Sequence, residues 1–210
     1  MRFVCAILLI LSINANSQKV KFRGNFDLPG LVKETAGIMT SLGIKIRENM
    51  EKDDTLKLDV TTKKEFFNAE FISHLVATPN KNSNQRYYIL PIIMISPTLD
   101  SVLFNKVDTN AFTRLKAFET IVHEITHFLQ ITLEDNYFRP TDMKDFNKYA
   151  SQLSEIEAYA VGGYYFLKYY NKKKLKTILK SKTSNLEKMK SLFKTLYETL
   201  YPWRPKIVFE

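Results

Sequence analysis

The sequence predicts an α+β protein with a small N-terminal sheet and a helical C-terminal part. Apolar and polar residues alternate with a period of two in the segments 44–48 and 55–62, as they do in half-buried strands. The segment 87–96 is a nearly continuous run of aromatic and β-branched residues, which is typical of a buried strand. From residue 112 onward, apolar residues recur at steps of three and four, as on one face of a helix. The strand patterns therefore precede the long helical ones, which favours the α+β class.

The first residues, 1–17, are typical of a secretory signal peptide. A basic N-terminus precedes the apolar run FVCAILLILSI, and small polar residues follow it. A run of about eleven residues is too short for a membrane-spanning helix, which needs about twenty. We expect cleavage after Ser17, with a cut after Ala15 as the alternative. Residues 18–210 would then form a single secreted or periplasmic domain.

The cysteine content and the charge of the chain limit the disulfide bonds and the partners that can be expected. The only cysteine, Cys5, lies in the expected signal peptide, so the secreted protein would have no disulfide bond. The formal net charge is +9, and much of the excess lies in the segment 172–182. We expect this basic C-terminal helix to contact anionic surfaces. Nucleic acid is not the expected partner, because lysines scattered along amphipathic helices usually form a solvated basic face.

The N-terminal half is expected to contain two helices and an edge strand. The segment 28–42 carries apolar residues on one helical face, and Gly43 would end this helix. The segment 63–78 fits a helix better than a strand and precedes a polar surface loop. Pro91 removes a backbone donor from the strand 87–96, which indicates an edge position or a bulge.

Three helical stretches are expected in the C-terminal half. Capping residues precede a long amphipathic helix over 112–129. A second stretch runs from about residue 145 to residue 170 and is interrupted only by Gly162 and Gly163. A third, basic helix fills 172–200. Two glycines either allow close packing against the first helix or kink the chain, and we favour close packing.

One motif in the first of these helices carries chemistry. The segment VHEITHFLQ, residues 122–130, places His123 and His127 four residues apart, so that both imidazoles project from one helical face and reach one metal ion. Glu124 lies beside the first histidine and can accept a proton from a water molecule at the metal. The composition of the chain gives about 0.003 expected chance occurrences of HExxH. The alternative interpretation is a pair of buried histidines that bind nothing.

A catalytic zinc ion needs three protein ligands and an open position, so a further ligand is required. Gln130 and Leu133 exclude a third histidine on the same segment. His74, in the predicted upstream helix, is a less favoured source than the segment SEIEAYA, where Glu155 and Glu157 begin the second helical stretch. The role of Gln130 itself stays open.

The spacing of the two motifs resembles that of a known group of enzymes. HEITH followed about thirty residues later by a helical glutamate resembles the gluzincin metallopeptidases, several families of which carry Glu-x-x-Ala-(Asp or Asn) in the second motif. Glu155 and Ala158 match that pattern, whereas Tyr159 replaces the acid or amide that would orient a histidine ligand. The resemblance implies a zincin-like fold and makes Glu155 the preferred third ligand, with Glu157 as the second choice.

By this resemblance the chain is expected to be an exported zinc metallopeptidase that hydrolyses a protein or peptide substrate. Zn²⁺ would be bound by His123, His127 and Glu155, and Glu124 would act as the general base towards a water molecule. A tyrosine beside the metal would stabilise the oxyanion, and Tyr159 is the first choice. The other candidates for this role are Tyr149, Tyr164 and Tyr165.

The resemblance also implies that an extended substrate pairs with the predicted edge strand 87–96. Two alternative functions stay open on the residues alone. One is a non-catalytic secreted binding protein that retains a zincin-like shell. The other is a zinc amidase that acts on cell-wall peptides with the same metal ligands.

Overall fold

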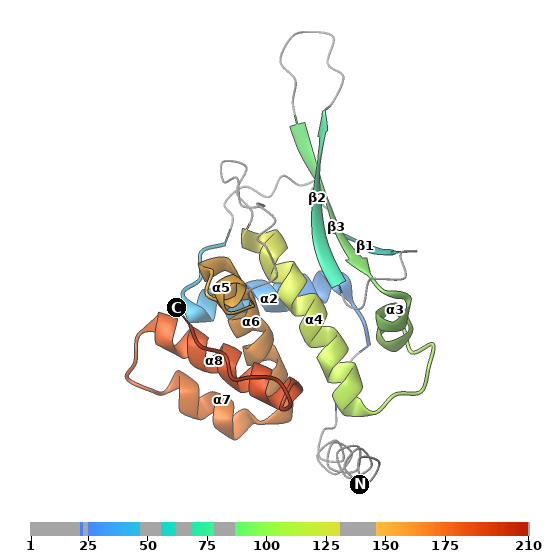
Figure 1. Cartoon of the computed structure of the whole chain (residues 1–210). Coiled ribbons are helices and arrows are strands. Elements are labelled where there is room, and N and C mark those ends of the chain that lie inside the picture. Colours follow the sequence, from blue (N-terminus) through green and yellow to red (C-terminus); the bar gives the residue numbers. More distant parts are fainter. Residues whose placement is uncertain are drawn as a thin grey trace.

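The computed structural model describes residues 22, 25–46, 56–61, 69–77, 87–130 and 146–209, and the expected signal peptide lies outside these ranges. The described residues form a small sheet and a larger set of helices, in agreement with the predicted α+β class (Figure 1). Within the same ranges, every helix is too short or too polar to span a bilayer. The elements are, in chain order, α2 (Leu28–Leu42), β1 (Lys57–Val60), β2 (Ala69–Ala77), β3 (Tyr87–Ile95), α3 (Pro97–Leu103), α4 (Ala111–Gln130), α5 (Phe146–Ala150), α6 (Leu153–Tyr170), α7 (Lys172–Leu179) and α8 (Asn185–Leu200).

The sheet places β3 between its two neighbours. The strand order is β1-β3-β2, with β1 parallel and β2 antiparallel to β3. The strands predicted over 55–62 and 87–96 are therefore formed, but the edge position predicted for the second strand is wrong. Pro91 is tolerated because β1 pairs with β3 only from Ile92 onward, so that Pro91 faces β2 alone among the described strands. The outer strand on that side of the sheet is β2.

The helix predicted over 63–78 is wrong for its described part, which is the strand β2. All nine residues of β2 pair with β3, from Ala69 opposite Ile95 to Ala77 opposite Tyr87. The local sequence AEFISHLVA has apolar residues in adjacent pairs, a spacing that fits a helix face as well as a strand. Long-range pairing with β3 decides between the two, and His74 consequently lies on a strand.

The helix α2 ends at Gly43 as predicted, with a left-handed backbone at φ 73°. The N–H of Gly43 donates to the carbonyl of Thr40 at 3.1 Å, and that of Ile44 donates to Met39 at 2.9 Å, a Schellman closure of the helix. The strand predicted over 44–48 is absent from its described part, 44–46. The reason is that the Ile44 N–H closes α2 and is not available to a neighbouring strand.

The helical half follows the prediction in α4 and departs from it in the later helices. Asn110 caps α4, since its side-chain oxygen accepts from the Thr113 N–H at 2.9 Å. The second predicted stretch is broken at Ser151 and Gln152 into α5 and α6. The third is broken at residues 180–184 into α7 and α8. The predictions of two continuous helices are therefore wrong at these two breaks.

The pair of glycines in α6 lets this helix pack closely on two neighbours. A Cβ atom on Gly162 would lie 2.5 Å from Oε1 of Glu119 in α4, and one on Gly163 would lie 2.8 Å from the carbonyl oxygen of Leu192 in α8. The glycines do not interrupt α6, which runs continuously from Leu153 to Tyr170. The predicted close packing against the first helix is confirmed.

The helix α4 lies at the centre of the fold. It contacts β2 and β3 on the side of the sheet, and it also contacts α2, α3 and α6 (Figure 1). In turn, α6 packs against α4 and α8. Ile93, Ile121 and Phe166 are fully buried in the resulting core, and burial of such a side chain contributes about 1.5–3 kcal/mol. The two helices that carry the predicted motifs are thus held side by side.

Candidate metal centre

The HEITH motif of α4 and the first turn of α6 bring three ligand side chains together. The Nε2 atoms of His123 and His127 lie 3.1 Å apart. Glu155 directs Oε1 at His127 Nε2 over 3.4 Å and Oε2 at His123 Nε2 over 3.6 Å. Among the described residues, these three form a group that could hold a metal ion. Residues 32 positions apart in the sequence therefore meet at one point.

The spacing of the group is compatible with a shared metal ion. Ligand bonds of about 2.0–2.1 Å separate two tetrahedral ligand atoms by about 3.3 Å. The two Nε2 atoms lie 3.1 Å apart, and each faces a different oxygen of Glu155, at 3.4 and 3.6 Å. The Oε2 atom of Glu155 is buried and has no hydrogen-bond partner among the described residues, a deficit that a cation would satisfy. Two imidazoles and one carboxylate suit a first-row divalent ion but do not by themselves select zinc.

The protonation states within the group differ from residue to residue. Burial, with the neighbouring His127 charge, lowers the pKa of His123 to about 3. Burial acts in the same direction on His127, but its hydrogen bond to Glu155 and the charges of Glu155 and Glu124 outweigh burial and raise its pKa. For Glu155, burial is outweighed by the hydrogen bond and charge of His127, so its pKa is lowered. The metal-free group therefore keeps His123 neutral and Glu155 ionised.

The group is nearly enclosed but keeps contact with solvent. The side chains of His123, His127 and Glu155 are 10%, 12% and 9% exposed. A catalytic metal needs a position for water or substrate besides its protein ligands, and this exposure is compatible with one. Glu124, the next residue after His123 on α4, is also buried, and its charge contributes to raising the pKa of His127.

Comparison with known proteins adds no family to this picture. No protein-family model matches the chain, and neither the curated proteins nor the solved structures give a match. The metal centre therefore rests on the geometry of its own side chains.

The structure separates the two candidate glutamates. Glu155 faces the histidines, whereas Oε2 of Glu157 accepts a hydrogen bond from Nε2 of Gln130 at 2.7 Å. The other side-chain atom of Gln130, Oε1, lies 3.1 Å from Nδ1 of His127. Glu157 thus reaches the group through Gln130 and is not one of the three converging ligands. The sequence did contain a signal for Gln130, because a residue three positions after His127 shares its helical face.

Two of the four candidate tyrosines lie at the group. The ring of Tyr159 packs edge-on against the His123 ring with centroids 4.3 Å apart, and it stacks on Phe193 at 4.1 Å. Burial and the charge of the neighbouring Glu155 raise the pKa of Tyr149. The remaining two lie elsewhere on α6, since Tyr164 lines a groove with residues of α2 and α7 and Tyr165 packs against Phe22 and Tyr169.

A further buried carboxyl group, Glu119, was not singled out by the sequence. It lies on α4 one turn before His123 and is only 5% exposed. Burial raises its pKa to about 8, although the charge of Lys116 acts in the opposite direction. At neutral pH Glu119 is therefore mainly protonated, in contrast to Glu155 in the same interface between α4 and α6.

Proposed function

We propose that the chain is an exported zinc-dependent metallopeptidase with a zincin-like fold. The observation that carries this proposal is the convergence of two imidazole Nε2 atoms and one carboxylate within 3.1 to 3.6 Å, beside the glutamate of HExxH. Export rests on the apolar N-terminal run of the sequence. Zinc is the proposed ion because this ligand set, with an adjacent carboxylate, is the one used for zinc-dependent hydrolysis.

The residues around the group have separable roles in such a reaction. His123, His127 and Glu155 would hold the ion, which when bound supplies a Lewis acid at the scissile carbonyl. The Glu124 carboxylate takes a proton from the attacking water and delivers it to the leaving nitrogen. The hydroxyl groups of Tyr149 and Tyr159 are the candidates for donating to the oxyanion that develops on the carbonyl. Burial and the charge of Glu155 raise the pKa of Tyr149, which supports a place for its hydroxyl near the group.

The strand β2 is the proposed place for an extended peptide substrate. It is one of the two outer strands of the described sheet, and it contacts α4, the helix that carries HEITH. A strand in this position can pair with a peptide through main-chain hydrogen bonds. The strand first expected in this role, 87–96, is a weaker candidate because β3 lies between β1 and β2 and pairs with both of them over Ile92–Ile95.

A single substitution tests the proposed chemistry. The secreted form should bind about one zinc ion per chain, and Glu124→Gln should keep that zinc while hydrolysis of a protein such as casein falls by about 10²–10⁴-fold, because the general base is lost. Zinc content is measured by elemental analysis and hydrolysis by release of soluble peptides. Glu198→Gln is the matched control, since Glu198 is an exposed residue of α8.

The same assay distinguishes the alternatives. Equal hydrolysis by the Glu124→Gln variant and the wild type would contradict the mechanism. Zinc binding by a wild type that hydrolyses neither proteins nor cell-wall peptides would favour the non-catalytic binding protein. Activity confined to cell-wall peptides would favour the amidase.

A further inference from the structure

Gln130 is the last residue of α4 and is held in one orientation by α6. Its Nε2 atom donates to Oε2 of Glu157 at 2.7 Å and to the carbonyl oxygen of Ser154 at 3.3 Å. The backbone carbonyl of Ser154 can only accept a hydrogen bond, and so can an ionised Glu157 carboxylate, so the amide nitrogen is the atom that faces them. The amide oxygen of Gln130 is consequently the atom that faces His127.

This orientation decides which nitrogen of His127 is available to a metal ion. An amide oxygen only accepts, so the Nδ1 atom of His127, 3.1 Å away, carries a proton and donates it to Gln130. Nε2 is then the nitrogen with a lone pair when the ring is neutral, and it is the atom that faces His123 and Glu155. The hydrogen bond also fixes the ring plane, because a rotated ring would lose it.

The same amide joins the two helices that supply the ligands. Ser154 and Glu157 belong to the first turns of α6, on either side of Glu155, and Gln130 contacts both. A change in the position of Gln130 would therefore move the Glu155 carboxylate relative to His127 as well as the imidazole itself.

The other histidine has no comparable hydrogen bond. The Nδ1 atom of His123 is buried and has no hydrogen-bond partner among the described residues. Its ring is held instead by the edge-on contact with Tyr159, at the position where the resembling pattern has an acid or amide. Orientation by hydrogen bond is thus concentrated on His127.

We infer that Gln130 and Glu157 are positioning residues of the metal centre, with Glu157 holding the Gln130 amide and Gln130 holding His127. This inference rests on the proposed metal centre. It assigns a role to the eighth position of HExxHxxQ and to the second glutamate of SEIEAYA, and it gives neither residue direct contact with the ion.

Metal affinity tests the inference without an activity assay. Zinc dissociation constants are measured by competition with a chromogenic chelator, and the visible absorption of the Co²⁺-loaded protein reports the ligand geometry. Gln130→Ala should weaken zinc binding by about 10–100-fold and alter the Co²⁺ spectrum, as loss of a group that orients a metal ligand does. Gln152→Ala is the matched control, because Gln152 precedes α6 without a side-chain capping bond.

A double substitution separates positioning from general packing. Gln130→Glu alone keeps an acceptor for His127 but sets two carboxylates against each other, so we expect weaker zinc binding. Adding Glu157→Gln reverses the direction of the hydrogen bond, with the new amide donating to the new carboxylate, and the pair keeps the wild-type charge. The double variant should recover most of the affinity and the Co²⁺ spectrum.

The possible failures are distinguishable. If the wild type binds zinc and both Gln130→Ala and Glu157→Ala bind it equally well with an unchanged Co²⁺ spectrum, the positioning role is overturned and the metal centre stands. Failure of the double variant to improve on Gln130→Glu would also contradict it. If the wild type binds no zinc, the metal centre and the positioning role fall together.

Discussion

Glu119 and Glu155 lie in the same interface, between α4 and α6, and they are similarly buried at 5% and 7% exposure. Despite this similar burial, the two carboxyl groups differ in protonation state. The pKa of Glu119 is raised to about 8 by burial, whereas the hydrogen bond and charge of His127 overcome burial at Glu155 and lower its pKa. One carboxyl group is kept neutral and the other is kept ionised.

The difference follows from what each carboxyl group faces. Glu155 faces two imidazole nitrogen atoms at 3.4 and 3.6 Å. Glu119 lies against the backbone of α6 at Gly162, and the nearest cationic influence is Lys116, whose own pKa is lowered by burial. A buried carboxyl group in a helix interface is therefore not by itself a cation site, because the converging nitrogen atoms are needed to keep it charged.

The largest expected effect is on metal binding. Glu155→Gln removes the charge of the proposed third ligand and should weaken zinc binding by more than about 100-fold, beyond the range for groups that only orient ligands. Glu119→Gln removes a group that is neutral at pH 7 and should leave the zinc affinity within about threefold of the wild type, since it faces no ligand atom. Chelator competition measures both. A larger loss of zinc affinity in Glu119→Gln than in Glu155→Gln would contradict the contrast between these two carboxyl groups.

The pH dependence of stability should be the second largest effect. Glu119 has a pKa of about 8 in the folded chain against 4.5 as its ordinary value. Between these values the folded state retains a proton that the unfolded state has lost, so the contribution of Glu119 is fully present below pH 4.5 and is lost as pH rises to 8. The loss is at most about 1.4 kcal/mol per pH unit.

The Glu119→Gln variant tests this sign. Its free energy of unfolding relative to the wild type should increase from pH 5 to pH 8, measured by urea denaturation of both proteins with a chelator present. A difference that stays constant over this range would show that Glu119 is ionised in the folded protein.

A smaller effect concerns the packing that encloses Glu119. Gly162→Ala should destabilise the chain by about 1–3 kcal/mol because its Cβ meets the Glu119 carboxyl at 2.5 Å. In a Glu119→Ala background that penalty should disappear. Gly163→Ala meets the backbone of Leu192 at 2.8 Å and should cost the same in both backgrounds. Equal penalties for Gly162→Ala with and without Glu119 would contradict the close contact.

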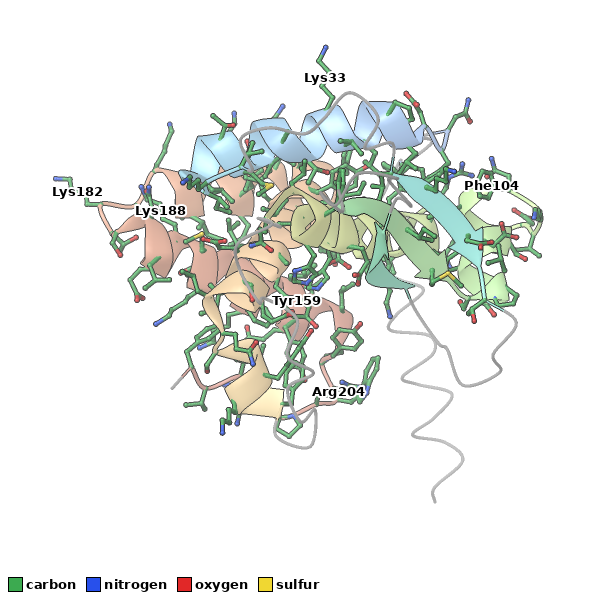
Figure 2. All side chains as sticks on the ribbon, turned by 90° about the horizontal axis from the view of Figure 1, so that it is seen from above. Lys33, Phe104, Tyr159, Lys182, Lys188 and Arg204 are labelled. Atoms are coloured by element: carbon green, nitrogen blue, oxygen red, sulfur yellow. The ribbon has the colours of Figure 1, made fainter. Side chains whose placement is uncertain are left out.

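The smallest effect on the site should come from the basic surface of α7, where Lys172, Lys173 and Lys176 line one exposed groove. Figure 2 shows Lys182 and Lys188, on the neighbouring segments, extending outward from the molecule. Replacing Lys172, Lys173 and Lys176 by glutamine should weaken binding to anionic lipid vesicles by about 1 kcal/mol for each lysine at low salt. The zinc affinity should be unchanged, and a change in it would show that the charge state of Glu155 depends on this distant surface.

Much of α4 could be predicted from the sequence because its signals are local. Apolar spacing, the Asn110 cap and the paired histidines all lie within the helix or beside it. The break between α7 and α8 also has a local signal, since the side chain of Ser184 accepts from the Glu187 N–H at the start of α8. The prediction missed this signal because it treated the basic segment as one helix. Ser96 and Pro97 likewise give a cap and a first-turn proline for α3, which the prediction omitted.

The rest depended on contacts between distant segments. The segment AEFISHLVA forms the strand β2 and not a helix because it pairs with β3. This pairing cannot be predicted from the local pattern of the segment. Periodicity places Glu155 and Glu157 on different faces of α6 but does not say which face packs on α4. The neutral state of Glu119 and the bridge from Gln130 to Glu157 follow from that same packing.

The most direct test of the proposed metal centre is anomalous diffraction at the zinc edge, from crystals of residues 18–210 grown with zinc. The structure predicts one anomalous peak within about 2.0–2.2 Å of Nε2 of His123, Nε2 of His127 and a carboxylate oxygen of Glu155. Zinc bound elsewhere, or a Glu155 carboxylate turned away from the peak, would contradict the metal centre.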